Sequence, residues 1–248
     1  MEFHLVVALA CFFIGLSKGG LGGPIPVAIL TPLLSQIIPP SQAVGLVLVP
    51  LLAGDVIAIS LYWRKWDSAR IKQLLPWSVL GIAVGAFVLF GLANSNQNVI
   101  LKRVIGAFTL LVVVYKVSSG RLTTLKYESR NWHGWLAGTL TGFGSALANV
   151  GAPPYTAYML LQKIENPTVF IGTTSLLFGI LNLVKLPIVL TNPKVLDIHL
   201  LLSILWALPI IPIGAWLGRK SLDYINPILF EQIMLVGLFI LSLVNLFG

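Results

Sequence analysis

Charged residues are scarce in this sequence. Asp, Glu, Lys and Arg make up 10% of the 248 residues, whereas 57% are hydrophobic, and the mean hydropathy is +0.93. Soluble domains carry about 25% charged residues, so this chain has too few to cover a surface that faces water. The sequence therefore indicates a polytopic protein embedded in the lipid bilayer. The net charge of +8 is then explained by basic loops that orient a membrane protein, and we expect no nucleic-acid partner.

Residues that build metal centres, redox sites and catalytic sites are also rare. Cys11 is the single cysteine, which excludes an intrachain disulfide. His4, His133 and His199 do not have the spacing of metal ligands. The sequence contains no HExxH motif, no paired cysteines and no phosphate-binding loop. We therefore expect a protein that is not an enzyme and that holds no metal and no cofactor.

Long apolar runs, in contrast, are abundant. Most have about 19 to 24 residues, enough for a helix that spans the roughly 30 Å hydrocarbon core. These runs lie at 41–62, 73–93, 99–117, 167–190, 198–218 and 227–247. Two further regions contain shorter apolar runs on either side of a break, 3–16 with 25–38 and 134–148 with 153–163. Each of these regions is interpreted as a re-entrant pair of short helices or as two tilted spans.

The two halves of the chain resemble each other. Similar residues recur at a nearly constant offset: Gly15 with Gly142, Pro24 with Pro153, and Asp55 with Asn182. Each half would hold one broken or re-entrant helix pair and three transmembrane helices, and this odd number of crossings inverts the second half. The expected fold is all-α, with two inverted-topology repeats at 1–118 and 132–248 joined by a cytoplasmic linker at 119–131. Inverted repeats with broken helices are typical of secondary transporters.

The basic residues predict the orientation of the chain in the membrane. Most of the 16 Lys and Arg residues fall on the side reached after the 41–62 span, mainly at 64–72, 116–130 and 219–220. Cytoplasmic loops carry an excess of Lys and Arg. This side is therefore expected to be cytoplasmic, with the N- and C-termini outside. A bacterial inner membrane is the expected location.

A break in the first half combines glycines, prolines and a lysine in the stretch GLSKGGLGGPIP at 15–26. Pro24 suits the first turn of a new helix, where free N–H groups and the positive end of the dipole favour an anion. Lys18 adds a full positive charge. Pro153 in the second half again suits the first turn of a helix that follows a break. Two helix starts would then form a positive pocket near the middle of the membrane. The alternatives are glycines that serve only close helix packing and a Lys18 that reaches to the surface.

Three polar residues lie inside predicted spans. Asp55 is deep in the 41–62 span, Asn182 is its repeat partner, and Lys185 lies one turn beyond Asn182. Charges inside a membrane are costly and usually functional. Asp55 is expected either to pair with Lys18 or Lys185 or to carry a coupling proton, and a purely structural ion pair is the alternative. Lys185 could also extend outward to the surface.

The motifs of both halves resemble those of the TauE/SafE sulfite exporter family. In the first half the resemblance rests on GLSKGGLGGPIPVAILTPLL and AVGLVLVPLLAGDVIAISLYWRKWD, and in the second on GFGSALANVGAPP and FIGTTSLLFGILNLVKLP. It covers nearly the whole chain. The second break departs from the family pattern, because 146–149 read Ala-Leu-Ala-Asn where a more glycine-rich stretch is usual. This departure bears on the substrate, since the second repeat should shape half of the pocket.

The resemblance implies a secondary transporter that exports sulfite or a related small organosulfonate anion by alternating access. By this analogy the substrate-binding residues come from both breaks and from the later spans. They are Lys18, Gly19, Gly22, Gly23, Pro24, Ser145, Asn149, Gly151, Ala152, Asn182 and Lys185, with Asp55 as the coupling residue or ion-pair partner. The competing hypotheses are an anion channel that uses the same pocket and a membrane-embedded enzyme or assembly factor without transport activity.

Overall fold

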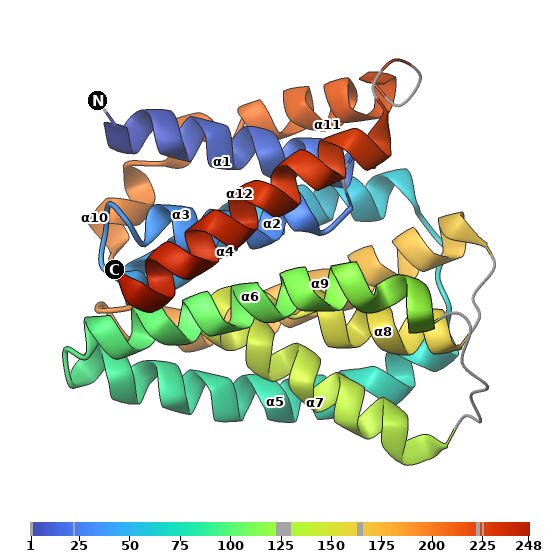
Figure 1. The fold of residues 1–248 in the computed structure, drawn as a ribbon, viewed down its shortest axis with the longest axis horizontal. Helices are drawn as coiled ribbons and strands as arrows, with labels where there is room; N and C mark the ends of the chain where they lie inside the picture. Colours follow the sequence, from blue (N-terminus) through green and yellow to red (C-terminus); the bar gives the residue numbers. More distant parts are fainter. Residues whose placement is uncertain (1, 22, 123–129, 163–165, 222–223, 225) are drawn as a thin grey trace.

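The computed structural model describes residues 2–21, 23–122, 130–162, 166–221, 224 and 226–248, and over these residues the regular structure is entirely helical (Figure 1). The helices are α1 (Glu2–Lys18), α2 (Ile25–Ala28), α3 (Leu30–Leu34), α4 (Pro40–Leu61), α5 (Ser68–Asn94), α6 (Asn98–Leu122), α7 (Asn131–Ala148), α8 (Ala152–Leu161), α9 (Pro167–Leu190), α10 (Ile198–Leu202), the 3₁₀-helix η1 (Leu205–Ala207), α11 (Ile210–Ser221) and α12 (Pro227–Phe247). The all-α fold expected from the sequence is confirmed.

Five of the described helices are long and apolar enough to cross a membrane, namely α4, α5, α6, α9 and α12, and the bent segment from α10 to α11 would make a sixth. The apolar runs therefore mark spanning helices, and the chain is a multi-pass membrane protein. The expected linker at 119–131 overlaps the end of α6, which continues to Leu122, and its residues 123–129 lie outside the described part.

The apolar run at 198–218 is not one straight helix. The chain bends by 46° between the α10–η1 segment and α11. Pro209 precedes the first residue of α11, and Pro212 lies in its first turn. A proline lacks the backbone N–H that a continuous helix needs and disfavours helical backbone in the residue before it. The helix is therefore interrupted although the apolar composition continues.

Both expected breaks are present. The apolar segment that comprises α2 and α3, Ile25–Leu34, and helix α8, Ala152–Leu161, are each about 15 Å long at the helical rise per residue, about half of the hydrocarbon core. α1 enters from the end of the bundle that holds the N-terminus, and α2 and α3 return to that end, whereas α7 and α8 form the same kind of pair from the opposite end (Figure 1). The structure therefore favours re-entrant pairs over tilted full spans.

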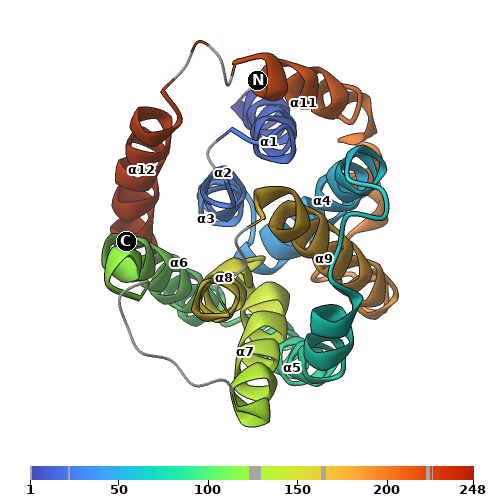
Figure 2. The same cartoon turned by 90° about the vertical axis from the view of Figure 1, so that its right-hand side faces the viewer.

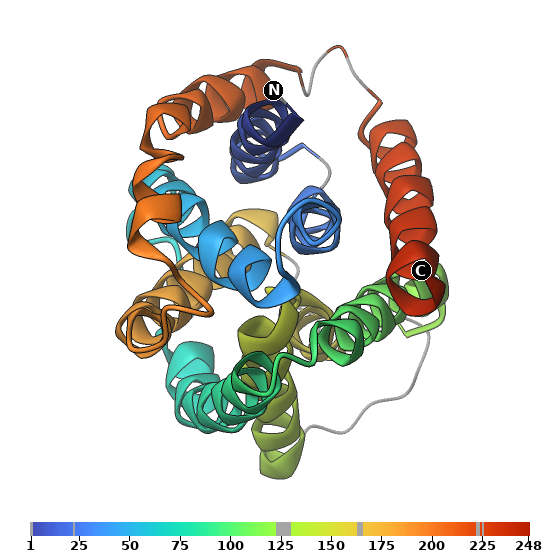
Figure 3. The ribbon, with the colours of Figure 1, turned by 90° about the vertical axis from the view of Figure 1, so that its left-hand side faces the viewer.

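The two halves pack against each other in a reciprocal way. α5 lies along α7 and α11 lies along α1, while α4 contacts α9 and α6 contacts α12. Viewed along the bundle, α2 with α3 and α8 lie inside a surrounding ring of helices (Figures 2 and 3). The short helices that follow the two breaks thus reach the interior of the bundle from opposite halves.

Glycines set the close approach of these helix pairs. A Cβ on Gly15 of α1 would lie 2.4 Å from the carbonyl oxygen of Ile211 in α11. A Cβ on Gly142 of α7 would lie 1.9 Å from the carbonyl oxygen of Ser78 in α5. Both contacts are with backbone, which cannot rotate away as a side chain would. The two helix pairs therefore require a glycine at these positions. Small residues are common at helix contacts in membranes for the same reason.

Replacing Gly142 with alanine is expected to destabilise the protein by about 3 kcal/mol or more, because the added methyl group must separate α7 from α5. Gly91 of α5 is the matched control, since nothing lies within 4 Å of a Cβ built there. Gly91→Ala should leave stability unchanged or raise it by about 0.5–1 kcal/mol through helix propensity. Thermal unfolding of the purified variants measures both effects, and equal midpoints would contradict this account of the contact.

Candidate functional site

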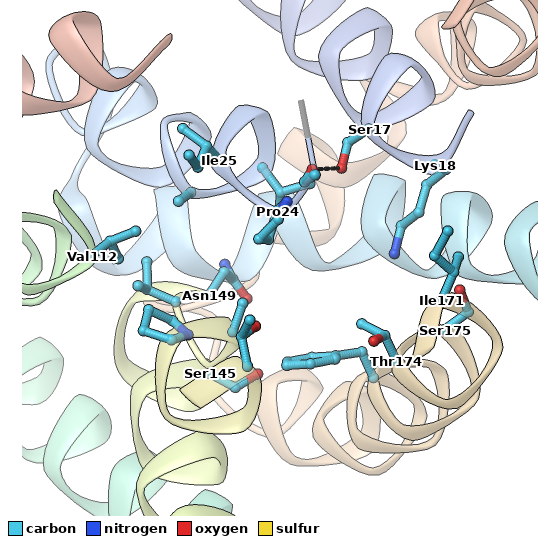
Figure 4. A pocket seen from close by; sticks show the side chains of 18 of the residues that line it. Ser17, Lys18, Pro24, Ile25, Val112, Ser145, Asn149, Ile171, Thr174 and Ser175 are labelled. Atoms are coloured by element: carbon cyan, nitrogen blue, oxygen red, sulfur yellow. Dashed lines mark hydrogen bonds between the residues drawn. The ribbon is translucent and has the colours of Figure 1, made fainter. Parts of the chain in front are cut away.

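The first break is a short loop of irregular backbone. α1 ends at Lys18, and Gly20 and Gly23 have positive φ angles of 107° and 57°, which glycine adopts without strain. The Ser17 hydroxyl donates a hydrogen bond of 2.5 Å to the carbonyl oxygen of Gly23, across the loop (Figure 4). Pro24 then precedes the first residue of α2. The hydrogen bond thus links the last turn of α1 to the residue that precedes Pro24.

The second break is closed by Asn149, which ends α7 in the left-handed conformation at φ 57°. Its side-chain nitrogen donates to the hydroxyl oxygen of Thr31 at 3.2 Å and to the carbonyl oxygen of Val44 at 2.9 Å. Pro153 lies in the first turn of α8. Asn149 therefore ties the break in the second half to α3 and α4 of the first half.

Asp55 and Lys18 form an ion pair in the interior of the bundle. The Asp55 side chain is 1% exposed and that of Lys18 is 16% exposed. The other carboxylate oxygen of Asp55 accepts a hydrogen bond of 2.6 Å from the side-chain amide of Asn182. The sequence left open whether Lys18 reaches the surface, and in the structure it turns inward to Asp55. Lys18 thus joins the first break to α4 and, through Asp55, to α9.

Lys185 is buried and bonded to the end of α7. Its ammonium donates to the Ser145 carbonyl oxygen at 3.1 Å, the Ser145 hydroxyl at 3.0 Å and the side-chain oxygen of Asn149 at 3.0 Å. The residue is 3% exposed. The expectation that Lys185 could extend outward is therefore wrong, because three oxygens in the interior satisfy its ammonium.

A cavity of about 250 Å³ lies between the two breaks (Figure 4). α1 and α2 contribute to its wall from the first half, and α7, α8 and α9 contribute from the second. The sequence-predicted residues that line it are Lys18, Gly23, Pro24, Ser145, Asn149, Ala152 and Asn182. The fold therefore brings residues from both breaks to one cavity, although they are more than one hundred positions apart in the chain.

The other expected site residues lie elsewhere. A Cβ on Gly19 would be 2.3 Å from the carbonyl oxygen of Ala215, so Gly19 packs against α11. Gly151 packs in the same way against the Thr141 carbonyl oxygen. Asp55 and Lys185 contact residues that line the cavity but are not among its lining residues themselves. Gly22 lies outside the residues that the structure describes.

Several residues that line the cavity were missed at the sequence level. Thr174 and Ser175 lie on the same face of α9 as Asn182, at spacings of seven and eight residues. This helical spacing of small polar residues is a signal that could have found them. The Tyr115 hydroxyl of α6 is buried and has no hydrogen-bond partner among the described residues. Because the residue lines the cavity and an unpaired buried hydroxyl is costly, this hydroxyl would gain a partner by turning toward a bound ligand.

A second ion pair lies in the wall of the cavity. Lys116 of α6 and Glu231 of α12 both line it, and their side chains are 2.5 Å apart. The pair connects two helices that contact each other along their lengths, one from each half of the chain.

Charged groups from both halves of the chain gather at this cavity. Lys18, Lys116 and Glu231 line it, and the ammonium of Lys185 and the carboxylate of Asp55 contact residues that line it. The family model described as Sulfite exporter TauE/SafE matches residues 7–245. The chain therefore belongs to the TauE/SafE sulfite exporter family, whose members are membrane transporters and not enzymes. No curated protein and no solved structure matches the chain significantly.

Proposed function

We propose that this protein is a secondary transporter that exports sulfite or a related small organosulfonate across the cytoplasmic membrane. The observation that carries the proposal is the net positive charge of the buried cluster, in which Lys18 and Lys185 outnumber Asp55. A sulfur oxyanion has several acceptor oxygens and suits ammonium groups and free backbone N–H groups. The cavity is just below the usual volume range of ligand pockets, as suits a small anion.

Alternating access between two inverted repeats is the proposed mechanism. It is supported by the reciprocal helix contacts and by the hydrogen bond between Asp55 and Asn182, the residues that the repeat alignment pairs. Asp55 and Asn182 would occupy equivalent positions in the two repeats. Residues related by a twofold axis contact each other only when they lie close to that axis. Rocking of one half against the other about this point would expose the cavity to each side in turn.

The orientation proposed from the basic loops places the N- and C-termini outside the cell. Both termini lie at one end of the bundle, and the segment between α4 and α5 lies at the opposite end with the last turn of α11 (Figure 1). Arg64, Lys65, Arg219 and Lys220 belong to this second end. An anion that leaves a cell with a negative interior moves with the field, which is worth about 2.3 kcal/mol per charge and 100 mV.

Flux measurements in reconstituted vesicles test this function. Wild-type protein should carry sulfite or a short organosulfonate with saturation, and a second anion of the same class should compete. Tyr115→Phe removes the buried, unpartnered hydroxyl of a residue that lines the cavity and should raise KM roughly 3- to 10-fold, the effect expected for one lost hydrogen bond to the anion. Flux that rises linearly without competition would instead indicate a channel, and absence of flux for the whole series would reject the proposed substrates.

A further inference from the structure

The contacts of Lys185 differ from those of the other buried lysine. Lys18 faces a carboxylate, whereas the ammonium of Lys185 is bonded to oxygens of Ser145 and Asn149, which carry no charge. No carboxylate lies within ion-pair distance of Lys185 in the part of the chain that the structure describes. A buried charge normally requires a charged partner or a set of well-placed dipoles. Here uncharged oxygens make the three hydrogen bonds of the ammonium, and the nearest carboxylate, that of Asp55, is held by Lys18 and Asn182.

These dipoles belong to the C-terminal end of a broken helix. Ser145 lies in the last turn of α7, and Asn149 is the residue that ends it. The last carbonyl groups of a helix carry a partial negative charge. One backbone carbonyl, one hydroxyl and one amide oxygen are the kinds of ligand that small hard cations take in proteins, and unwound helix ends bind coupling ions in secondary transporters. The ammonium of Lys185 thus occupies a position that has the chemistry of a cation site.

We propose that Lys185 is a tethered cation that fills a cation site at the broken end of α7. It fixes α9 to that end and places a positive charge behind Ser145 and Asn149, which line the cavity. The protein therefore requires no sodium or potassium ion at this position. Lys185 is a positioning residue and not a ligand of the transported anion, because its ammonium already has three acceptors and the residue does not line the cavity.

Chemical rescue tests the proposal without any measurement of transport. Lys185→Ala keeps Cβ and removes three carbons and the ammonium, which together equal propylammonium. With choline as the only cation, the unfolding midpoint of this variant should lie about 3–8 °C below that of wild type. Millimolar propylammonium should restore most of the difference. Sodium should restore part of it, and neither cation should change the wild-type midpoint.

Two variants show whether the rescue occurs at this site. Lys185→Met fills the space with an uncharged chain of similar length, so propylammonium should not stabilise it. Ser145→Ala in the Lys185→Ala background removes one of the three acceptor oxygens and should weaken the rescue several-fold. A rescue that is the same in all three variants, or the same with choline as with propylammonium, would overturn the proposal.

Wild-type protein provides a second test that needs no variant. Its thermal stability and any anion flux should be equal in sodium, potassium and choline buffers. If either quantity requires an alkali cation, Lys185 does not replace one and the proposal fails. Of these tests, only the flux measurement depends on the proposed transport function. Absence of wild-type flux would reject that function, whereas the rescue of stability would still decide the role of Lys185.

Discussion

Replacing Lys18 with methionine should lower the free energy of unfolding by about 3–5 kcal/mol, the cost of leaving a buried charge without its partner. Asp55→Asn should cost clearly less. The difference follows from burial, because Lys18→Met isolates a carboxylate that is 1% exposed, whereas Asp55→Asn isolates an ammonium that is 16% exposed and faces the cavity. Thermal or denaturant unfolding of the purified variants measures both changes.

The double variant Lys18→Met/Asp55→Asn completes the cycle. It should be more stable than Lys18→Met alone, since neither charge is then left unpaired, and the coupling energy should be about 1–3 kcal/mol. Lys72→Met is a control, because Lys72 is exposed on α5 and its substitution should leave stability unchanged within about 0.5 kcal/mol. If Lys18→Met and Lys72→Met have the same stability, the ion pair contributes nothing that the fold depends on.

The sequence predicts the helices and the breaks because both depend on local composition. Apolar runs specify the spans, and the clustered glycines and prolines at 15–26, with the prolines at 153–154, interrupt the helical backbone at the two breaks. The exception is the run at 198–218, where apolar composition conceals the bend before α11. Pro209 was the local signal for that bend. A proline alone does not predict a break, because Pro50, Pro76 and Pro187 lie inside continuous helices.

The contacts within the site depend on packing between distant helices, which one sequence does not encode locally. Asp55 had two candidate partners at the sequence level, and the path of α1 beside α4 selects Lys18. Gly19 and Gly23 belong to the same glycine motif, yet Gly19 contacts α11 and Gly23 lines the cavity. The position of α11 makes this difference. For Lys185 the sequence left both an interior position and an outward one open, because it shows the position along the span and not the oxygen partners on α7.

Substituting Asp55 with asparagine should raise the affinity of the pocket for its anion while it lowers the rate of turnover. In the wild-type protein the carboxylate of Asp55 holds the ammonium of Lys18. An arriving anion must therefore compete with this carboxylate for the ammonium. Asparagine cannot compete in this way, and the net charge of Lys18, Lys185 and residue 55 rises by one. Removing a like charge near a partly buried site is worth roughly 1.4–2.8 kcal/mol, or about ten- to a hundredfold in Kd.

Tighter binding slows release, so kcat for export should fall together with KM in Asp55→Asn. Binding of sulfite or the best organosulfonate to the purified protein, followed by calorimetry, separates affinity from turnover. Lys72→Met is the control, because Lys72 is exposed on α5 and does not line the cavity. Its effect on Kd should be less than about threefold. An Asp55→Asn protein that is folded and binds the anion more weakly than wild type would show that Asp55 holds Lys18 in position for the substrate and does not compete with it.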